Sequence, residues 1–252
     1  MLLPWLKNYD LLIFDQIDST NSEALRLAKT GVKGNFVIVA REQTDGKGRK
    51  GKLWESISGN LHMSILLRPM VDMCRIKELS FLTAVTLYEV IQEFANKLTA
   101  HKADIKLKWP NDVLVGGKKI AGILLESTCL SSVNCVIIGI GVNTHFIPDI
   151  SDVALTSLFN EGIILKSSDN LLSNFMDKFQ IHYSGWEAED SFDSIRKKWL
   201  KLAYNLNSNV TLDNGVQKVS GVFRSIDQEG AICIELADGK LCSFASGQVT
   251  YR

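Results

Sequence analysis

The stretch "IKLKWPNDVLVGGKKIAGILLEST", residues 105–128, decides the fold. Its two apolar runs flank the pair Gly116-Gly117, and adjacent glycines between apolar runs are typical of a tight β-hairpin turn. A further apolar run, "VNCVIIGIGVN", follows at 133–143. These stretches predict neighbouring strands of one sheet, so we expect the middle of the chain to form a mixed or antiparallel central sheet.

On the N-terminal side, strand patterns alternate with helix patterns. "STNSEALRLAKTG" (19–31) predicts a helix in which Thr20 and Glu23 form a capping box and Gly31 marks the end. Apolar residues at near-helical spacing predict a second, longer helix at 75–98. Short strands are predicted at 11–16, 35–40 and 61–69.

The character of the sequence changes near residue 206. Before that point two more helices are predicted, near 168–184 and 188–203. After it, short β-rich runs alternate with turn residues about every 8 to 12 positions, which is typical of a small β-barrel. We therefore expect an α+β fold in two domains. Residues 1–204 would form the sheet with flanking helices, and residues 205–252 the small barrel.

The composition excludes several classes of protein. The 252 residues are 46% hydrophobic, which is enough for one large domain and a small one. The 28 basic residues balance the 28 acidic ones, so no protein-wide attraction to nucleic acid is expected. The chain has neither an apolar run long enough to span a bilayer nor the basic start of a signal peptide. Its five cysteines form no C-x-x-C pair and its four histidines are scattered, which predicts reduced thiols, a cytoplasmic location and no zinc site.

The glycine-rich, basic stretch "EQTDGKGRKGKLW" (42–54) resembles two familiar phosphate-binding motifs without matching either. A dinucleotide fingerprint or a P-loop needs a helix directly after the glycines, and here Gly59-Asn60 and a strand follow instead. A P-loop also needs Ser or Thr after its lysine to hold Mg²⁺, whereas Leu53 follows Lys52. Neither motif is therefore expected.

The chemistry of this stretch still favours an anion. Its glycines allow backbone N–H groups to approach a ligand closely, and four cations stand within seven residues. A solvated surface loop is the alternative. Since ordering such a self-repelling loop costs about 1–2 kcal/mol per residue, a polyanion that pairs with several of its groups could offset the cost. Trp54 at its end is either ordinary core or a surface on which a base stacks.

Polar residues also stand at the ends of predicted strands and helices. "KWPND" (108–112) presents Asn111 and Asp112 after a strand, although Pro-Asn-Asp is also common in turns. "GIGVN" ends on Asn143 at another strand exit. "DSTN" (18–21) is either a simple helix cap or a cap that offers hydroxyl and amide groups to a ligand.

Two lysines, Lys118 and Lys119, follow the hairpin glycines. Successive residues of a strand face opposite ways, so only one of them can point into a pocket. The spacing does not say which.

Together, "DSTN", "EQTDGKGRKGKLW", "KWPND", "GKKIAGILLE" and "GIGVN" resemble the signature set of the biotin protein ligases, in that family's order and spacing. The resemblance covers nearly the whole chain. It implies a class II synthetase-like catalytic domain, an SH3-like C-terminal β-barrel and an ATP-dependent biotin–[acetyl-CoA-carboxylase] ligase. In that reaction, biotin and ATP form biotinyl-5′-AMP and pyrophosphate with Mg²⁺, and a lysine of a biotin carboxyl carrier protein then takes the biotin.

The resemblance also implies roles for individual residues. Catalytic roles fall to Arg49 and to Lys119, which would bridge the biotin carboxylate and the α-phosphate. Asp112 would lie beside the metal. Residues that match the family's biotin contacts are Ser19, Thr20, Asn21, Gln43, Lys47, Gly48, Arg49 and Lys119. Residues that match its ATP contacts are Arg49, Lys52, Trp54, Asn111 and Asn143.

The chain departs from the family pattern in its loop. Lys47 and Lys52 stand where arginines are usual; lysine keeps the charge but loses the bidentate fork, so looser retention of the adenylate is expected. Asp45 stands where a neutral residue is more usual, and we have no physical account of it. "DSTN" begins at residue 18, so we expect a ligase without a DNA-binding domain, with no membrane contact; a homodimer is allowed. The rival enzyme is a lipoate–protein ligase, and the rival non-enzyme is a nucleic-acid or adaptor module.

Overall fold

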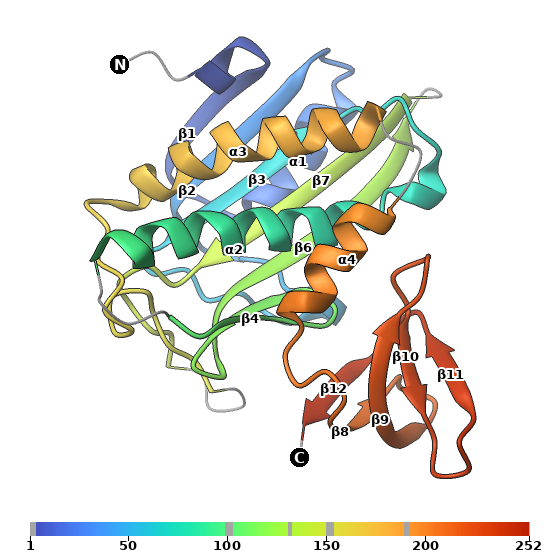
Figure 1. Cartoon of the computed structure of the whole chain (residues 1–252). Coiled ribbons are helices and arrows are strands. Elements are labelled where there is room, and N and C mark those ends of the chain that lie inside the picture. Colours follow the sequence, from blue (N-terminus) through green and yellow to red (C-terminus); the bar gives the residue numbers. More distant parts are fainter. Residues whose placement is uncertain (1–3, 99–102, 131–132, 150–153, 189–191, 252) are drawn as a thin grey trace.

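The computed structural model describes residues 4–98, 103–130, 133–149, 154–188 and 192–251. The described chain forms a seven-stranded sheet with helices on both faces, followed by a smaller five-stranded sheet (Figure 1). Among these residues, no helix combines the length and the apolar character that crossing a membrane requires. The α+β fold predicted from the sequence is confirmed.

The large sheet has the strand order β1-β2-β3-β7-β6-β5-β4. Its β1 and β2 are parallel, and every other neighbouring pair is antiparallel, so the sheet is mixed. As predicted, the stretches around residues 105–143 form adjacent strands. The bounds are β1 Tyr9–Ile17, β2 Asn35–Gln43, β3 Leu61–Leu67, β4 Ile105–Lys108, β5 Asp112–Val115, β6 Lys118–Leu130 and β7 Val133–Val142.

The hairpin between β5 and β6 turns through Gly116 and Gly117, whose φ angles are 55° and 76°. Left-handed backbone at both central positions suits a primed turn, which glycine adopts without steric cost. The hairpin sets the register that places Lys119 opposite Leu114 and Gly122 opposite Asp112. The predicted hairpin is therefore confirmed, and it fixes which residues of β6 face the site.

Long helices α2 (Glu78–Leu98) and α3 (Ser168–Ala188) lie across one face of the sheet (Figure 1). Their apolar sides bury the main core against side chains such as Met63, Ile65 and Ile138. Helix α1 (Thr20–Lys29) packs on the opposite face, over Ile38, Leu66 and Ile137. All seven residues of β3 are buried, because the strand is covered on both faces.

The start of α1 differs from the sequence prediction in one respect. The N-cap is Ser19, whose side chain accepts a hydrogen bond from the backbone N–H of Ser22, and Thr20 is the first helical residue. The predicted capping box of Thr20 and Glu23 is therefore wrong, and the Glu23 carboxylate pairs with Arg26 instead. The shift by one residue frees Thr20 for contacts with the sheet. Gly31, at φ 76°, follows the helix end as predicted.

Helix α4 (Asp193–Leu202) leads into the smaller antiparallel sheet, with strand order β11-β10-β9-β8-β12. Its strands are β8 Asn209–Asp213, β9 Lys218–Ile226, β10 Ile232–Glu235, β11 Leu241–Phe244 and β12 Gln248–Tyr251. In the described part of the chain, no ladder joins the outer strands β11 and β12. Residues between the strands join the two parts: the indole N–H of Trp109, after β4, donates to the carbonyl of Gly230, before β10, and Tyr204, after α4, meets Tyr251 of β12 edge to face.

Candidate functional site

One large cavity, of about 540 Å³, opens on the face of the main sheet that carries α1. Every residue to which the resemblance gives a role lines it, although they come from five separate stretches of the chain. They are Ser19, Thr20, Asn21, Gln43, Lys47, Gly48, Arg49, Lys52, Trp54, Asn111, Asp112, Lys119 and Asn143. The fold therefore brings together the whole set that the sequence could only name piecewise.

At one end of the cavity, the N-terminus of α1 is tied to β2. The backbone N–H of Thr20 donates to the side-chain oxygen of Gln43 at 2.8 Å, and the Gln43 amide donates to the Ser56 hydroxyl at 2.9 Å. Thr20 and Asn21 are buried. This end is uncharged along these contacts and carries hydroxyls and amides, so it suits a polar, neutral group of a ligand.

The basic loop forms a small hairpin over the cavity. The N–H of Gly48 donates to the carbonyl of Lys52 at 2.7 Å, and the N–H of Trp54 donates to the carbonyl of Gly46 at 2.8 Å. A Cβ on Gly46 would lie 2.3 Å from the Trp54 carbonyl oxygen, so glycine is required there. Lys50 has a φ of 55° at the tip, a conformation that is uncommon outside glycine.

The indole of Trp54 lies on two glycines of the sheet. A Cβ on Gly141 would be 2.3 Å from the ring, and one on Gly122 would be 2.9 Å from it. The Lys119 ammonium lies 5.3 Å from the ring centroid, within the range of a cation–π contact. The paired strands β6 and β7 thus provide a flat floor for an aromatic ring.

At the other end of the cavity, cations gather around one carboxylate. The Lys119 ammonium lies 2.7 Å from Asp112, and both side chains are about one-fifth exposed. The guanidinium of Arg49 donates to Asn111 at 3.1 Å. Burial lowers the pKa of Arg49, and Asp112 opposes that shift. Burial also lowers the pKa of Lys108, which Asp112 raises and Lys119 lowers further.

This arrangement leaves an excess of positive charge. Three buried or half-buried cations, Arg49, Lys108 and Lys119, share Asp112 as their acidic neighbour. Among the lining residues described, the only other carboxylate is that of Glu55, while Lys47, Lys50 and Lys52 add cations from the loop. A site of this kind binds a polyanion such as a triphosphate, because the anion relieves repulsion between desolvated cations.

Lys118 and Lys119 are separated by the alternation of β6. Lys118 turns away and pairs with Glu161 at 3.4 Å, whereas Lys119 lines the cavity. Asn143 also lines the cavity, but its amide donates to the backbone carbonyl of Thr156. Its side chain is therefore held in place by the protein.

Several lining residues carry no signal in the sequence. Gly247, directly before β12, and Gln248 and Val249 of β12 line the cavity, as do Glu55 and Leu155. The contribution of residues 247–249 depends on how the second sheet packs against the first, which short-range patterns do not encode. Lys108 also lines the cavity, and it was not predicted as a site residue. Its place in the motif "KWPND" is the signal that could have identified it.

Asp112 fits a role beside Mg²⁺. Magnesium in nucleotide sites is usually held by one or two carboxylates together with the phosphates of the substrate. Asp112 offers such a carboxylate within the cationic end. No cluster of three or more His, Cys, Asp or Glu side chains that could hold a metal occurs in the described ranges.

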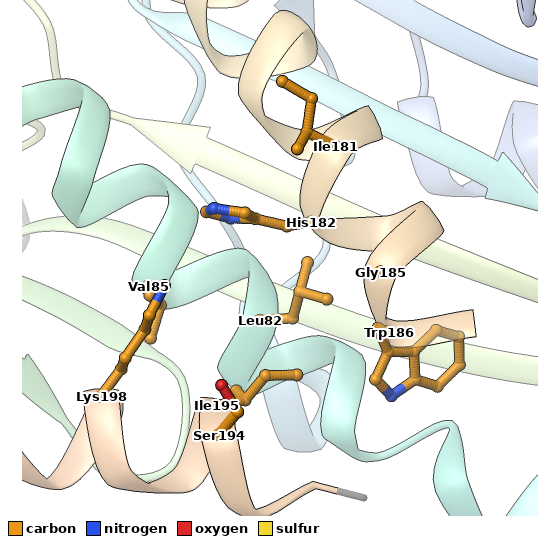
Figure 2. A pocket seen from close by; sticks show the side chains of 9 residues that line it. All are labelled: Leu82, Val85, Ile181, His182, Gly185, Trp186, Ser194, Ile195 and Lys198. Atoms are coloured by element: carbon orange, nitrogen blue, oxygen red, sulfur yellow. The ribbon is translucent and has the colours of Figure 1, made fainter. Parts of the chain in front are cut away.

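A second, smaller cavity of about 170 Å³ lies between α2, α3 and α4, on the helix-covered face (Figure 2). Apolar side chains such as Leu82 and Ile195 line it, with His182 and Lys198 at its edge. None of the residues predicted from the sequence contributes to it. The large cavity is therefore the candidate site.

Comparisons with known proteins agree with this site. The sequence model described as the Biotin/lipoate A/B protein ligase family matches residues 13–143, and that of the Biotin protein ligase C terminal domain matches residues 206–251. A biotin–[acetyl-CoA-carboxylase] ligase of Paracoccus denitrificans is 35% identical, over 88% of this chain and 93% of its own length. A bifunctional ligase/repressor of Bacillus subtilis is 30% identical, over 91% of this chain and 70% of its own.

The fold gives the same result. A biotin protein ligase from Aquifex aeolicus, solved in complex with biotin and ATP, superposes with a TM-score of 0.80 at 26% identity. The match covers 96% of this chain and 98% of that one. Sequence, architecture and the convergence of the motif residues on one cavity lead to a single assignment: the chain belongs to the biotin protein ligase family.

Proposed function

We propose that this protein activates biotin with ATP and transfers it to a lysine of a biotin carboxyl carrier protein. The observation that carries the proposal is the geometry of the cavity. Neutral hydroxyls and amides at Thr20, Asn21 and Gln43 stand at one end, and Arg49, Lys108 and Lys119 surround Asp112 at the other. A ligand with a neutral polar head and a carboxylate would therefore have its carboxylate directed toward the polyphosphate end.

In the first step, an oxygen of the biotin carboxylate attacks the α-phosphorus of ATP. The bond from that phosphorus to the bridging oxygen breaks, and pyrophosphate leaves. Both reactants are anions, so their approach must be assisted by positive charge that is already in place. Lys119 and Arg49 supply it, and Lys119 is suited to bridge the carboxylate and the α-phosphate because its ammonium lies beside both Asp112 of the cationic end and the Trp54 ring.

Asp112 would hold Mg²⁺ together with the phosphates of the nucleotide, and the metal would supply further neutralisation of their charge. Lys119 would then exchange its present partner, Asp112, for the reacting anions. Asn111, held by its own bond to the carbonyl of Ile123, would keep the Arg49 guanidinium directed into the cavity.

In the second step, the neutral amine of a carrier lysine attacks the carbonyl of biotinyl-5′-AMP. An amide forms, AMP leaves with its phosphate oxygen, and the amine loses a proton. The loop that carries Lys47, Gly48 and Lys52 would cover the mixed anhydride between the steps, which protects it from water. Trp54 would pack near the adenine, and Asn143 would contact phosphate or ribose.

The finer parts of the prediction remain proposals. We propose that residues 1–204 form a catalytic domain that binds biotin and ATP and that residues 205–252 form a small SH3-like β-barrel domain. We also propose a cytoplasmic location and action without DNA or membrane contact. We also propose that this chain can form a homodimer. Analytical ultracentrifugation tests this by measuring the mass of the protein in solution. The alternative substrate is lipoate, because the matching family model includes lipoate ligases.

The decisive experiment uses the purified full chain with ATP, Mg²⁺ and labelled pyrophosphate. Biotin should drive exchange between ATP and pyrophosphate, and lipoate should not. Adding a carrier domain should then give a biotinylated lysine that mass spectrometry locates. Exchange that depends on lipoate instead, or no exchange with either acid, would overturn the proposal.

A further inference from the structure

The amide of Asn21 is clamped between two strands and rests on a third. Its nitrogen donates to a carboxylate oxygen of Glu126 at 2.6 Å, and its oxygen accepts from the Ser64 hydroxyl at 2.6 Å. Ser64 belongs to β3 and Glu126 to β6, which flank β7 in the sheet (Figure 1). Under the amide lies Gly139 of β7, where a Cβ would be 2.2 Å from the Asn21 oxygen.

This contact fixes which way the amide points. An ionised carboxylate can only accept hydrogen bonds, so the Asn21 nitrogen must face Glu126 and the Asn21 oxygen must face Ser64. A flipped amide would place its oxygen against the carboxylate. The Ser64 hydroxyl therefore donates its hydrogen bond to the Asn21 oxygen.

The same constraint passes on to Thr20. The hydroxyl oxygens of Ser64 and Thr20 lie 2.7 Å apart. Ser64 donates toward both the Asn21 oxygen and the Thr20 oxygen, while the Thr20 hydroxyl donates to the side-chain oxygen of Gln43 at 3.1 Å. Because its proton is directed to Gln43, the Thr20 oxygen, which lines the cavity, keeps a lone pair and serves a ligand as an acceptor.

We propose that Glu126 is a positioning residue for biotin recognition. Glu126 does not line the cavity; it acts through Asn21 and Ser64, and so presets the donors and acceptors that meet the N–H and C=O groups of the ureido ring. This inference rests on the proposed function. Preset polarity lowers the cost of binding, because no hydroxyl or amide has to reorient when the ligand enters.

The test is the isosteric variant Glu126→Gln, whose amide both donates and accepts and so allows Asn21 to flip. The Kd for biotin, measured by calorimetry without ATP, should rise about ten- to hundredfold, as expected when a charge-assisted bond is replaced. The KM for biotin should rise in parallel. At saturating biotin, kcat and the KM for ATP should stay within about twofold of their original values. The variant weakens the binding of biotin in the ground state and the transition state alike, and it removes no contact made only in the transition state.

A matched control is Glu42→Gln. Glu42 also accepts from a side-chain amide, that of Gln16, but on the exposed edge of the same sheet and outside the cavity. It should leave the Kd for biotin unchanged. Ser64→Ala supplies an independent variant, since it removes the donor to the Asn21 oxygen, and it should also weaken biotin more than ATP.

Two results would overturn the role of Glu126. One is an unchanged Kd for biotin in both Glu126→Gln and Ser64→Ala. The other is an equal loss of biotin affinity, ATP affinity, kcat and thermal midpoint, which would mean a purely structural role. If the unsubstituted chain makes no biotinyl-5′-AMP, the proposed function fails as well. If it makes biotinyl-5′-AMP and both variants bind biotin as the unsubstituted chain does, this inference fails alone.

Discussion

The ammonium of Lys119 lies 2.7 Å from the carboxylate of Asp112 and 5.3 Å from the ring centroid of Trp54. A single side chain thus connects the cationic end of the cavity with its aromatic floor. Both side chains of the ion pair are only about one-fifth exposed, so Lys119 can give up Asp112 when another anion, such as a phosphate or a carboxylate, takes its place. The Lys119 ammonium is therefore in place to stabilise the negative charge of the biotin carboxylate and the α-phosphate as they react.

Lys119→Ala should nearly abolish adenylation while the fold persists. We expect biotin-dependent ATP–pyrophosphate exchange to fall by a factor of at least about 10², the order seen when a preplaced transition-state donor is removed. Lys118→Ala is the control, since Lys118 pairs with Glu161 outside the cavity. Near-normal pyrophosphate release by Lys119→Ala would refute the role given to this residue.

A methyl group at residue 141 should displace Trp54. The added Cβ would lie 2.3 Å from the indole, so Gly141→Ala should shift the tryptophan fluorescence and lower the free energy of unfolding by about 1–3 kcal/mol. Exchange activity should fall with it. The control is Gly185→Ala in α3, where a Cβ meets nothing within 4 Å. Unchanged fluorescence in Gly141→Ala would contradict the position of the indole.

Much of the fold is encoded locally. The glycine pair 116–117 predicts its hairpin because a primed turn needs left-handed backbone at both positions, and the apolar runs around it predict strands by their length. The start of α1 shows the limit of such patterns. Ser19 and Thr20 are both good caps, and contacts of Thr20 with Gln43 and Ser64, distant in sequence, decide between them.

The candidate site is predictable in its residues but not in its geometry. Alternation along β6 says that Lys118 and Lys119 face opposite ways, yet only the packing of α1 and the loop decides which face is the cavity. Glu126 was missed because its partner Asn21 is 105 residues away in sequence. Gly247, directly before β12, was missed because its place in the cavity depends on how the second sheet packs against the first.

Stability should fall in mild acid because of His62, on β3. His62 is 1% exposed, and burial lowers its pKa to about 4. The unfolded chain binds the proton near pH 6.5, so the neutral ring contributes stability above that pH that is lost as the pH falls toward 4. Between pH 7 and pH 5 this amounts to about 2 kcal/mol.

Urea unfolding at the two pH values measures this loss. In His62→Phe, the loss between pH 7 and pH 5 should be smaller by about that 2 kcal/mol, whatever the variant's absolute stability. The control is His145→Phe, because His145 lies at the surface end of the loop after β7 and is only half-buried. An identical pH dependence in His62→Phe and the unsubstituted protein would show that His62 is not the group responsible.

The two lysines of the basic loop should make the adenylate easier to lose. Lys47 and Lys52 each offer a point charge, whereas arginine would grip a phosphate with two parallel hydrogen bonds. The double variant Lys47→Arg and Lys52→Arg should slow release of preformed biotinyl-5′-AMP by roughly tenfold, about 1.4 kcal/mol, as followed by filter retention in pulse–chase. Lys33→Arg tests the specificity of this effect, since Lys33 is exposed and does not line the cavity. It should change the off-rate little. An off-rate in the double variant equal to that of the unsubstituted chain would mean that phosphate contacts from this loop do not limit retention, and that closure of the loop as a whole sets the lifetime of the intermediate.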